Sequence, residues 1–173
     1  MARLGYLEIG EVTSPLVREM FAYWEEMRAG RPLPLKADFD PSRVPRLLPY
    51  LTLEEVHRDP FRIRYRLVGT EQARFAAEDF TGRWLHELAW EPKVVEGLLE
   101  QYRLVLESRA PVFGASMFLW IDGYEKAFEW GVFPLATDGE TISHFIAIED
   151  FYNVDRAHIL QLVDEQLRSK GPA

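Results

Sequence analysis

The chain has 173 residues, of which 47% are hydrophobic and 28% charged, a balance that predicts one soluble domain with a buried core. The formal net charge of -8 disfavours nucleic acids and anionic membranes as partners, because both bind basic surfaces. The absence of cysteine excludes disulfides, thiolate metal sites and cysteine nucleophiles. The longest nearly apolar run, residues 112–121, is shorter than the ~20 residues of a membrane-spanning helix. We therefore expect a cytoplasmic protein that neither spans a membrane nor binds nucleic acid.

Residues 1–30 are expected to form an N-terminal helical extension. Ser14 followed by Pro15 is a helix N-cap with proline at the first helical position, and Gly30 ends the segment. Apolar side chains recur between these points at helical spacing: Leu16, Met20, Tyr23, Trp24 and Met27. Residues 31–35 contain two prolines and predict an extended connector, after which Asp40 and Pro41 predict the start of a short helix.

Two strands joined by a turn are predicted next, over residues 51–56 and 61–68. The second strand alternates apolar residues with arginines, which is the period of a strand with one buried and one solvated face. Its three arginines are Arg62, Arg64 and Arg66. The turn between the strands, residues 58–60, has the sequence Arg-Asp-Pro and the composition of a turn.

The second half of the chain predicts one long helix, three strands and a last helix. The helix begins at Pro92 and ends near Ser108, with an apolar stripe along one face. Strand-like runs follow at residues 112–121, 125–133 and 141–149, separated by the Asp-Gly pairs 122–123 and 138–139, which are strong hairpin signals. The final helix opens between residues 153 and 155. Residues 31–152 are thus expected to form the folded core and residues 153–173 a C-terminal helix.

This order of elements predicts an α+β fold with a five-stranded antiparallel sheet. The strands form a pair and a triplet connected by hairpins, whereas a parallel sheet would alternate each strand with a helix. We expect the central helices to cover one face of the sheet. The N- and C-terminal helices then flank the core, on the opposite face or against a partner.

Three segments carry a resemblance to PAS domains. Residues 65–70, Tyr-Arg-Leu-Val-Gly-Thr, resemble the second strand and following turn of that fold, and residues 80–85, Phe-Thr-Gly-Arg-Trp-Leu, resemble its glycine turn before the long helix. Residues 146–151, Ile-Ala-Ile-Glu-Asp-Phe, resemble its acidic exit motif. With the prefix at residues 33–41, the chain most resembles the short stand-alone PAS proteins common in alphaproteobacteria. The resemblance covers roughly residues 20–152.

The resemblance implies a sensory or protein-interaction module. It also allows two classes of PAS cofactor to be judged by the residues that they would need. Matching the glycine turn to that of flavin-binding light sensors places Leu85 where those proteins carry the cysteine of the photoadduct, so that chemistry is not expected. The helix of residues 92–108 contains no histidine, which disfavours haem ligation of the kind known from other PAS domains. No cofactor is evident, and an unidentified small molecule stays open as the ligand.

Candidate ligand-binding residues lie where a PAS cavity meets the sheet and the segments before the long helix. Aromatic walls with a few polar groups are typical of a ligand pocket, although the same residues also build plain cores. His144 is included because a histidine inside an apolar strand face would be a buried polar group. The candidates are Tyr65, Phe75, Trp84, Phe118, Trp130 and His144.

Candidate partner-binding residues lie on the first helix and on the arginine strand. The apolar stripe with Met20 and Trp24 could bind a second copy of the chain, as N-terminal helices do in related PAS proteins, or it could cover the sheet. Arg62, Arg64 and Arg66 could bind an acidic partner or a broad anion such as a nucleotide, or they could solvate an edge strand and prevent edge-to-edge pairing. With no output domain in the chain, any signal is expected to pass in trans to a protein partner.

Three functions remain open on the sequence alone. A ligand-sensing PAS module predicts an internal cavity, and a ligand-free interaction scaffold predicts a filled core. A cone-type isomerase or dehydratase predicts a deep pocket in which His86 or His144 contacts a carboxylate. No metal site and no convincing catalytic motif is present, so we expect a protein that is not an enzyme.

Overall fold

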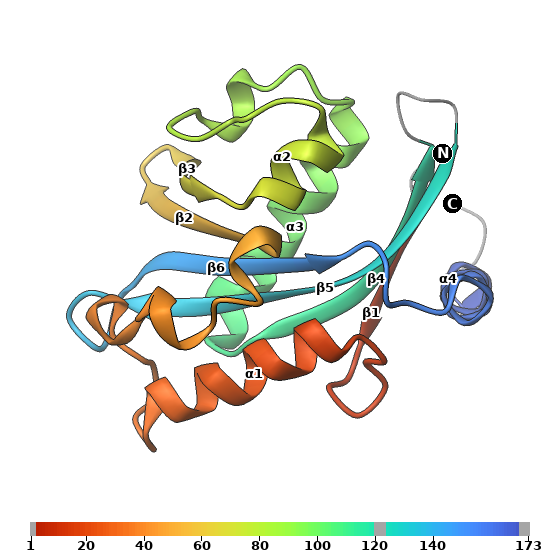
Figure 1. Cartoon of the computed structure of the whole chain (residues 1–173). Coiled ribbons are helices and arrows are strands. Elements are labelled where there is room, and N and C mark those ends of the chain that lie inside the picture. The colour runs from red at the N-terminus through yellow and green to blue at the C-terminus, as the bar shows by residue number, and fades with distance from the viewer. Residues whose placement is uncertain (1–2, 120–123, 170–173) are drawn as a thin grey trace.

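A computed structural model describes the backbone of residues 3–119 and 124–169 and the side chains of residues 5–117 and 124–165 (Figure 1). In this part of the chain, six strands form one antiparallel sheet in the order β1-β4-β5-β6-β2-β3. Their bounds are β1 Arg3–Leu7, β2 Leu51–Arg58, β3 Phe61–Val68, β4 Val112–Leu119, β5 Glu125–Ala136 and β6 Ile142–Asp150. The α+β class and the antiparallel sheet agree with the sequence prediction.

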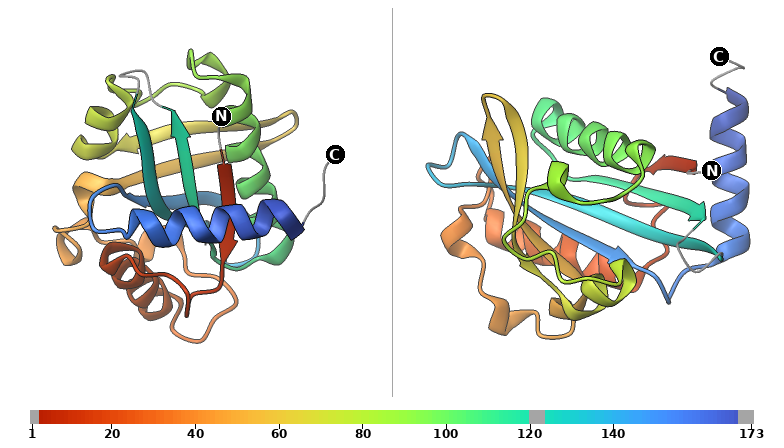
Figure 2. Two further views of the ribbon diagram at one scale, coloured as in Figure 1. Left: turned by 90° about the vertical axis from the view of Figure 1, so that its right-hand side faces the viewer. Right: turned by 90° about the horizontal axis from the view of Figure 1, so that it is seen from above.

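Four α-helices cover the described sheet. They are α1 (Pro15–Arg28), α2 (Thr70–Ala76), α3 (Pro92–Ser108) and α4 (Arg156–Ser169). The helices α2 and α3 lie over one face, whereas α1 packs on the opposite face against β5 and β6 (Figure 1). The last helix, α4, crosses β1, β4 and β5 at one end of the sheet (Figure 2). The central helices therefore cover one face, α1 covers the other, and both terminal helices flank the sheet, as expected.

The strand β1 is the main difference from the sequence prediction, which has five strands and a purely helical segment over residues 1–30. In the structure Arg3 pairs with Met117 and Leu7 with Phe113, so β1 extends the sheet beyond β4. A segment of only five residues carries little strand character of its own. The strand forms because the edge of β4 offers unpaired backbone N–H and C=O groups.

The helix α1 begins and ends where its capping residues predict. The hydroxyl of Ser14 accepts a hydrogen bond from the Val17 N–H at 3.1 Å, and Pro15 occupies the first turn. Ala29 and Gly30 both have positive φ, which ends the helix. The apolar stripe of the helix is buried against the sheet: Leu16, Val17, Met20, Tyr23, Trp24 and Met27.

Short 3₁₀ turns connect α1 to the sheet and α2 to α3. They are η1 (Lys36–Asp38), η2 (Pro41–Arg43), η3 (Leu48–Tyr50) and η4 (Leu85–Glu87). The short helix expected after Asp40 is therefore only the three-residue turn η2, since Asp40 caps the N–H of Ser42 but the segment does not propagate.

The hairpin between β5 and β6 forms as its Asp-Gly pair predicts. The Asp138 carboxylate accepts the N–H groups of Glu140 and Thr141, and Gly139 has a φ of 83°. The other Asp-Gly pair, at residues 122–123, lies outside the described residues. In the described part of the chain, no helix has the length and apolarity needed to cross a membrane.

Candidate functional site: a cavity between α3 and the sheet

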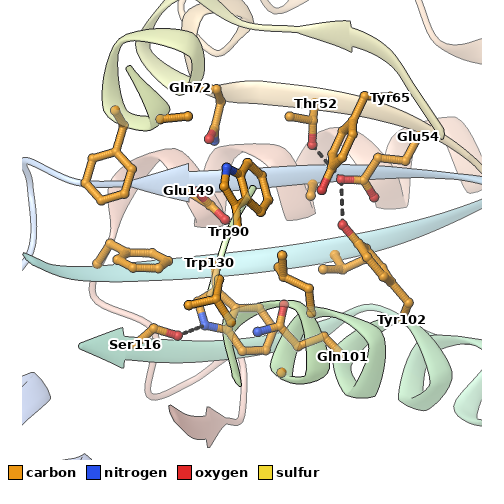
Figure 3. A pocket seen from close by; sticks show the side chains of 18 of the residues that line it. Thr52, Glu54, Tyr65, Gln72, Trp90, Gln101, Tyr102, Ser116, Trp130 and Glu149 are labelled. Carbon is orange, nitrogen blue, oxygen red and sulfur yellow. Dashed lines mark hydrogen bonds between the residues drawn. The ribbon is translucent and has the colours of Figure 1, made fainter. Parts of the chain in front are cut away.

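A cavity of about 320 Å³ lies between the sheet and the helices α2 and α3 (Figure 3). Its floor comes from β2, β3, β4, β5 and β6, and its walls from α2, α3 and the segment that connects them. The volume falls at the lower end of the range of small-molecule pockets, about 300–1,000 Å³.

Strand alternation decides which side chains reach the cavity. On β5, Phe128, Trp130 and Val132 line the cavity, and on β6 the lining residues are Ala147 and Glu149. These positions are two apart, so the residues between them point to the face covered by α1. The floor of the cavity is therefore fixed by the register of the sheet.

The wall formed by α3 contains a glycine in the first half of the helix. Gly97 lines the cavity, and a Cβ placed on it would meet no atom within 4 Å. Gln101, one helical turn further, also lines the cavity and is 7% exposed. The middle of α3 thus leaves open space where a larger side chain would pack.

Aromatic rings surround most of this space. The indole N–H of Trp130 donates to the Ser116 hydroxyl at 2.9 Å, which fixes the ring in the floor (Figure 3). Tyr65, Phe80 and Trp90 form a cluster with centroid separations of 4.6–6.3 Å. Such rings give an apolar ligand contact area and present negative faces to a cation.

Glu54 is the least expected residue of the cavity. It lies on β2, is 1% exposed and lines the cavity. Its Oε1 accepts hydrogen bonds from the hydroxyls of Thr52 at 2.7 Å and Tyr102 at 2.9 Å, whereas Oε2 has no hydrogen-bond partner. A buried polar atom without a partner costs about 1–3 kcal/mol.

Burial raises the pKa of the Glu54 carboxyl to about 8, against the opposing effect of the hydrogen bonds from Thr52 and Tyr102, and the nearby Glu149 raises it further. At pH 7 the carboxyl therefore holds its proton. Because Oε1 already accepts two hydrogen bonds, the proton belongs on Oε2. The cavity wall thus contains Glu54 either as a neutral carboxylic acid or, once ionised, as a carboxylate.

A register shift explains why no arginine neutralises Glu54. The pairing of β2 with β3 shifts between Leu53 and Glu54, so Glu54 stands opposite Tyr65 instead of Arg66. Arg66 points outward and lies 3.7 Å from Glu55. The bulge therefore leaves Glu54 among the cavity's aromatic and hydroxyl groups.

Glu149 supplies a second carboxyl to the cavity. It is partly exposed on the cavity wall, and burial raises its pKa to about 7, with hydrogen bonding by Gln72 acting in the opposite direction. The other charged residues among the described cavity lining are Lys93, Glu96 and Glu100, all exposed on α3 at the rim. The cavity is therefore lined by four carboxyl groups and one ammonium group.

Three of the six predicted ligand-binding residues line the cavity: Tyr65, Phe75 and Trp130. Trp84 and His144 do not, and the side chain of Phe118 lies outside the described residues. Trp84 packs against His57, with ring centroids 4.8 Å apart, and below the Arg64 guanidinium at 5.6 Å. It therefore lies on the outer face of the β2–β3 hairpin.

His144 faces the side of the sheet opposite to the cavity. Its neighbours Phe145 and Ala147 alternate with it along β6, and Ala147 lines the cavity. The half-buried imidazole lies 3.0 Å from the Ser143 hydroxyl, and burial followed by the charge of Lys36 lowers its pKa. No described residue of the cavity wall is a histidine, so the pocket lacks the histidine–carboxylate contact expected of a cone-type enzyme.

The arginine strand has the predicted alternation, and β3 is an edge strand. Arg62 and Arg66 are exposed, whereas Arg64 donates to the Gly82 carbonyl at 3.1 Å. Residues 82 and 83 also bond to the backbone of Tyr65, so this segment covers part of the free edge. These contacts fit a solvated edge strand, and a partner for the arginines stays a prediction.

Met20 and Trp24 are not available to a partner. They are 0% and 3% exposed, and the Trp24 indole N–H donates to the Pro134 carbonyl at 2.8 Å. The apolar stripe of α1 therefore packs inside the chain, and the surface proposed on these two residues for a dimer is replaced by a contact with β5 and β6.

A second group of buried carboxylates connects the sheet to both terminal helices. Glu129 accepts the N–H groups of Thr13 and Ser14, at 2.8 and 2.7 Å. Asp150 accepts the Ser14 hydroxyl at 2.7 Å and the N–H groups of residues 152 and 153, just before α4. Among the described residues, no three histidine or carboxylate side chains are placed to hold a metal ion.

Sequence reasoning missed Glu54, Glu149 and Tyr102. Glu54 and Thr52 occupy the polar positions of an alternating strand, which ordinarily face water. Tyr102 is a buried residue of α3, and its hydrogen bond to Glu54 joins residues 48 apart in the chain. The alternation of apolar and polar residues over positions 51–56 was the only signal in the sequence. Which side of the sheet the polar residues face could be decided only once the arrangement of strands and helices was known.

Comparison with known proteins gives one family and one fold. A family model described as PAS domain matches residues 12–148. The dark structure of the blue-light photoreceptor Aureochrome1 LOV is 11% identical with a TM-score of 0.52, over 74% of this chain and 91% of that one. A light-oxygen-voltage domain studied with a flavin analogue is 10% identical with a TM-score of 0.52, over 74% and 93% of the two chains.

An RNA-binding light-oxygen-voltage receptor is 14% identical with a TM-score of 0.50, over 98% of this chain and 43% of that one. At such identities the likeness concerns the fold alone. A search of curated proteins finds no match. Because the family match covers well over half of the sequence, and the sheet and helices have the matching arrangement, the chain belongs to the PAS domain family.

Proposed function

We propose that this PAS domain is a sensor that binds an organic small molecule in the cavity between α3 and the sheet. The observation that carries the proposal is the cavity of about 320 Å³, whose wall contains the buried carboxyl of Glu54 with one oxygen unpartnered. A ligand would fill space that the protein leaves open and supply a polar partner for this carboxyl. The sensory role of the PAS family supports the same conclusion.

The main alternative is a ligand-free scaffold, which predicts a filled core. The open space at Gly97 and the buried Glu54 argue against it, because a core without ligand is more stable when a larger helix residue fills the gap and the carboxyl is absent. An enzymatic role has weaker support, since the described cavity wall carries carboxyls but no histidine.

The residues of the cavity argue against a flavin photoadduct and against a phosphate-bearing flavin. The sequence has no cysteine, and Leu85 is buried outside the cavity lining. A phosphate would meet Glu54 and Glu149, and the one ammonium of the described lining, on Lys93, lies at the rim. Haem ligation by α3 is also disfavoured, because this helix has no histidine. We therefore propose a ligand of different chemistry.

We further propose that the signal leaves through the end of β6 toward a protein partner. Glu149 lines the cavity, and its neighbour Asp150 points to the other face, where it bonds to the cap of α1 and the turn before α4. A displacement of this strand end would move both helices. The lack of cysteine fits the reducing cytoplasm, which we keep as the proposed compartment.

Ligand extraction tests the proposed function. Wild-type protein is purified natively and denatured, and released small molecules are identified by mass spectrometry. We expect wild type and Gly97→Ala to release the same molecule, whereas Gly97→Leu, which fills the cavity, releases much less. Gly97→Ala is the matched control because it improves the helix by about 1 kcal/mol without reaching far into the cavity.

Two results would count against the proposed function. One is a wild-type protein that releases no molecule and gains no thermal stability from any member of a metabolite library. The other is a folded Gly97→Leu variant that retains the ligand in full, because the ligand would then lie elsewhere.

A further inference from the structure

We propose that the ligand is an organic cation, an amine with an apolar body, whose ammonium group pairs with the carboxyl of Glu54. This inference rests on the proposed function, because it names the chemical class of molecule that the cavity takes. Nothing in the fold family requires it. It follows from how Glu54 is held and from which charges face it.

The hydrogen bonds to Glu54 would stabilise its ionised carboxylate when a cation is bound. Thr52 and Tyr102 both donate to Oε1, so two hydroxyls already stabilise negative charge on one oxygen. The other oxygen, Oε2, is fully buried and has no hydrogen-bond partner, while the residue as a whole lines the cavity. An ammonium group that pairs with this carboxyl from the cavity supplies the counter-charge that the buried carboxyl lacks.

The groups around Glu54 carry no competing cation among the described residues of the cavity wall. On β6 the facing titratable group is Glu149, on β3 it is Tyr65, and on α3 it is Tyr102. Burial raises the pKa of both tyrosines well above the ordinary value, so they stay neutral. The exposed α3 residues at the rim are Lys93, Glu96 and Glu100. The resulting negative potential favours entry of a cation.

The aromatic walls suit the same ligand. Tyr65, Trp90 and Trp130 surround the space beside Glu54 (Figure 3). Ring faces attract a desolvated ammonium and also contact an apolar body. Glu149, on the adjacent strand toward the other end of β2, can bond a second polar group of the ligand. A carboxylate or phosphate ligand would instead be repelled by both carboxyls once they are ionised.

The direction of the pH dependence separates a cation from a neutral hydrogen-bond acceptor. A neutral acceptor needs the proton on Glu54, so its affinity falls as the pH rises past about 8. A cation needs the ionised form and therefore releases a proton when it binds below that pH. About 1% of the carboxyl is ionised at pH 6 and about half at pH 8, so the affinity for an amine rises by up to about 50-fold over this interval.

Three matched probes test the inference: 2-phenylethylamine, 2-phenylethanol and phenylacetate. Isothermal titration calorimetry at pH 6, 7 and 8, in two buffers of different ionisation enthalpy, gives affinities and the protons released. We expect the amine at pH 8 to bind at least about tenfold more tightly than the alcohol, since a buried charge pair exceeds a neutral hydrogen bond. Phenylacetate should bind most weakly. Proton release should accompany the amine alone.

Two variants locate the effect. Glu54→Gln keeps the shape of the side chain but cannot ionise, so it should remove the preference for the amine and its pH dependence while the alcohol still binds. Glu55→Gln is the control, because Glu55 is the next residue of β2 and points outward toward Arg66. It should retain the wild-type preference.

The outcomes distinguish the inference from the proposed function. Equal binding of amine and alcohol, affinity for the amine that falls with pH, or an unchanged preference in Glu54→Gln would overturn the inference, and so would a released natural ligand without a basic nitrogen. In each of those cases the cavity still binds a ligand, so the proposed function stands. If no probe binds the wild-type protein and extraction also yields nothing, both fail.

Discussion

Replacing Glu54 with glutamine should make the ligand-free protein more stable above pH 6 and flatten its pH dependence. The glutamine amide keeps an oxygen that accepts from Thr52 and Tyr102, and its NH₂ group takes the place of the unpartnered Oε2. The difference between the two proteins is therefore the titration of one buried carboxyl.

The sign and size follow from the pKa of Glu54, which burial raises from 4.5 to about 8 in the folded state. The unfolded chain loses this proton near pH 4.5, while the folded chain keeps it up to about pH 8. Stability contributed by the neutral carboxyl is thus complete below pH 4.5 and is lost as the pH rises to 8. The expected slope is about 1.4 kcal/mol per pH unit, and the total loss is at most about 5 kcal/mol.

Urea denaturation followed by tryptophan fluorescence at pH 5, 6, 7, 8 and 9 measures this difference. Ligand must first be removed by refolding, because a bound cation would hold Glu54 ionised and hide the effect. Glu55→Gln serves as the control on the outward face of β2. The reasoning is refuted if wild type and Glu54→Gln keep a constant stability difference from pH 5 to pH 9.

Two further substitutions test the packing that frames the site. Gly114→Ala would place a Cβ 2.3 Å from the Trp130 ring, so we expect a loss of about 3 kcal/mol in denaturant midpoints, whereas Gly10→Ala, with no atom within 4 Å, should have little effect. Ser14→Ala removes the α1 cap and a hydrogen bond to the buried Asp150, which should lower the free energy of unfolding by about 2 kcal/mol. Ser14→Thr keeps a hydroxyl and should retain most of this stability. Equal stability of the two variants would contradict the capping role.

Most of the fold could be predicted because its elements carry local signals. Ser14 and Pro15 start α1, Gly30 follows its end, and the alternation over residues 61–68 defines β3. The strand β1 could not be predicted, since its five residues become a strand only by pairing with β4. The dimer surface on α1 was misplaced for a related reason: an apolar stripe shows that a helix is covered but not by which surface.

The candidate cavity could be predicted only in its aromatic part. Tyr65, Phe75 and Trp130 were found because large rings on strands and on a short helix after a glycine turn are typical of the region that a PAS ligand contacts. Trp84 was included on the same reasoning and His144 as a possible buried polar group, but each lies on a face set by the register of its strand or turn. A shift of one residue in the strand register moves a side chain to the opposite face of the sheet.

Glu54 shows why the polar residues of the site could not be identified from the sequence. In residues 51–56 the apolar positions 51 and 53 suggest a buried face, and the alternate positions 52 and 54 suggest water. In this sheet both faces are covered by helices, so the polar face of the strand turns toward the cavity. The bulge beside Leu53 then separates Glu54 from Arg66. A buried carboxyl without an arginine, in a space that Gly97 keeps open, is a feature of the pairing of strands, and it is the feature on which the proposed ligand chemistry depends.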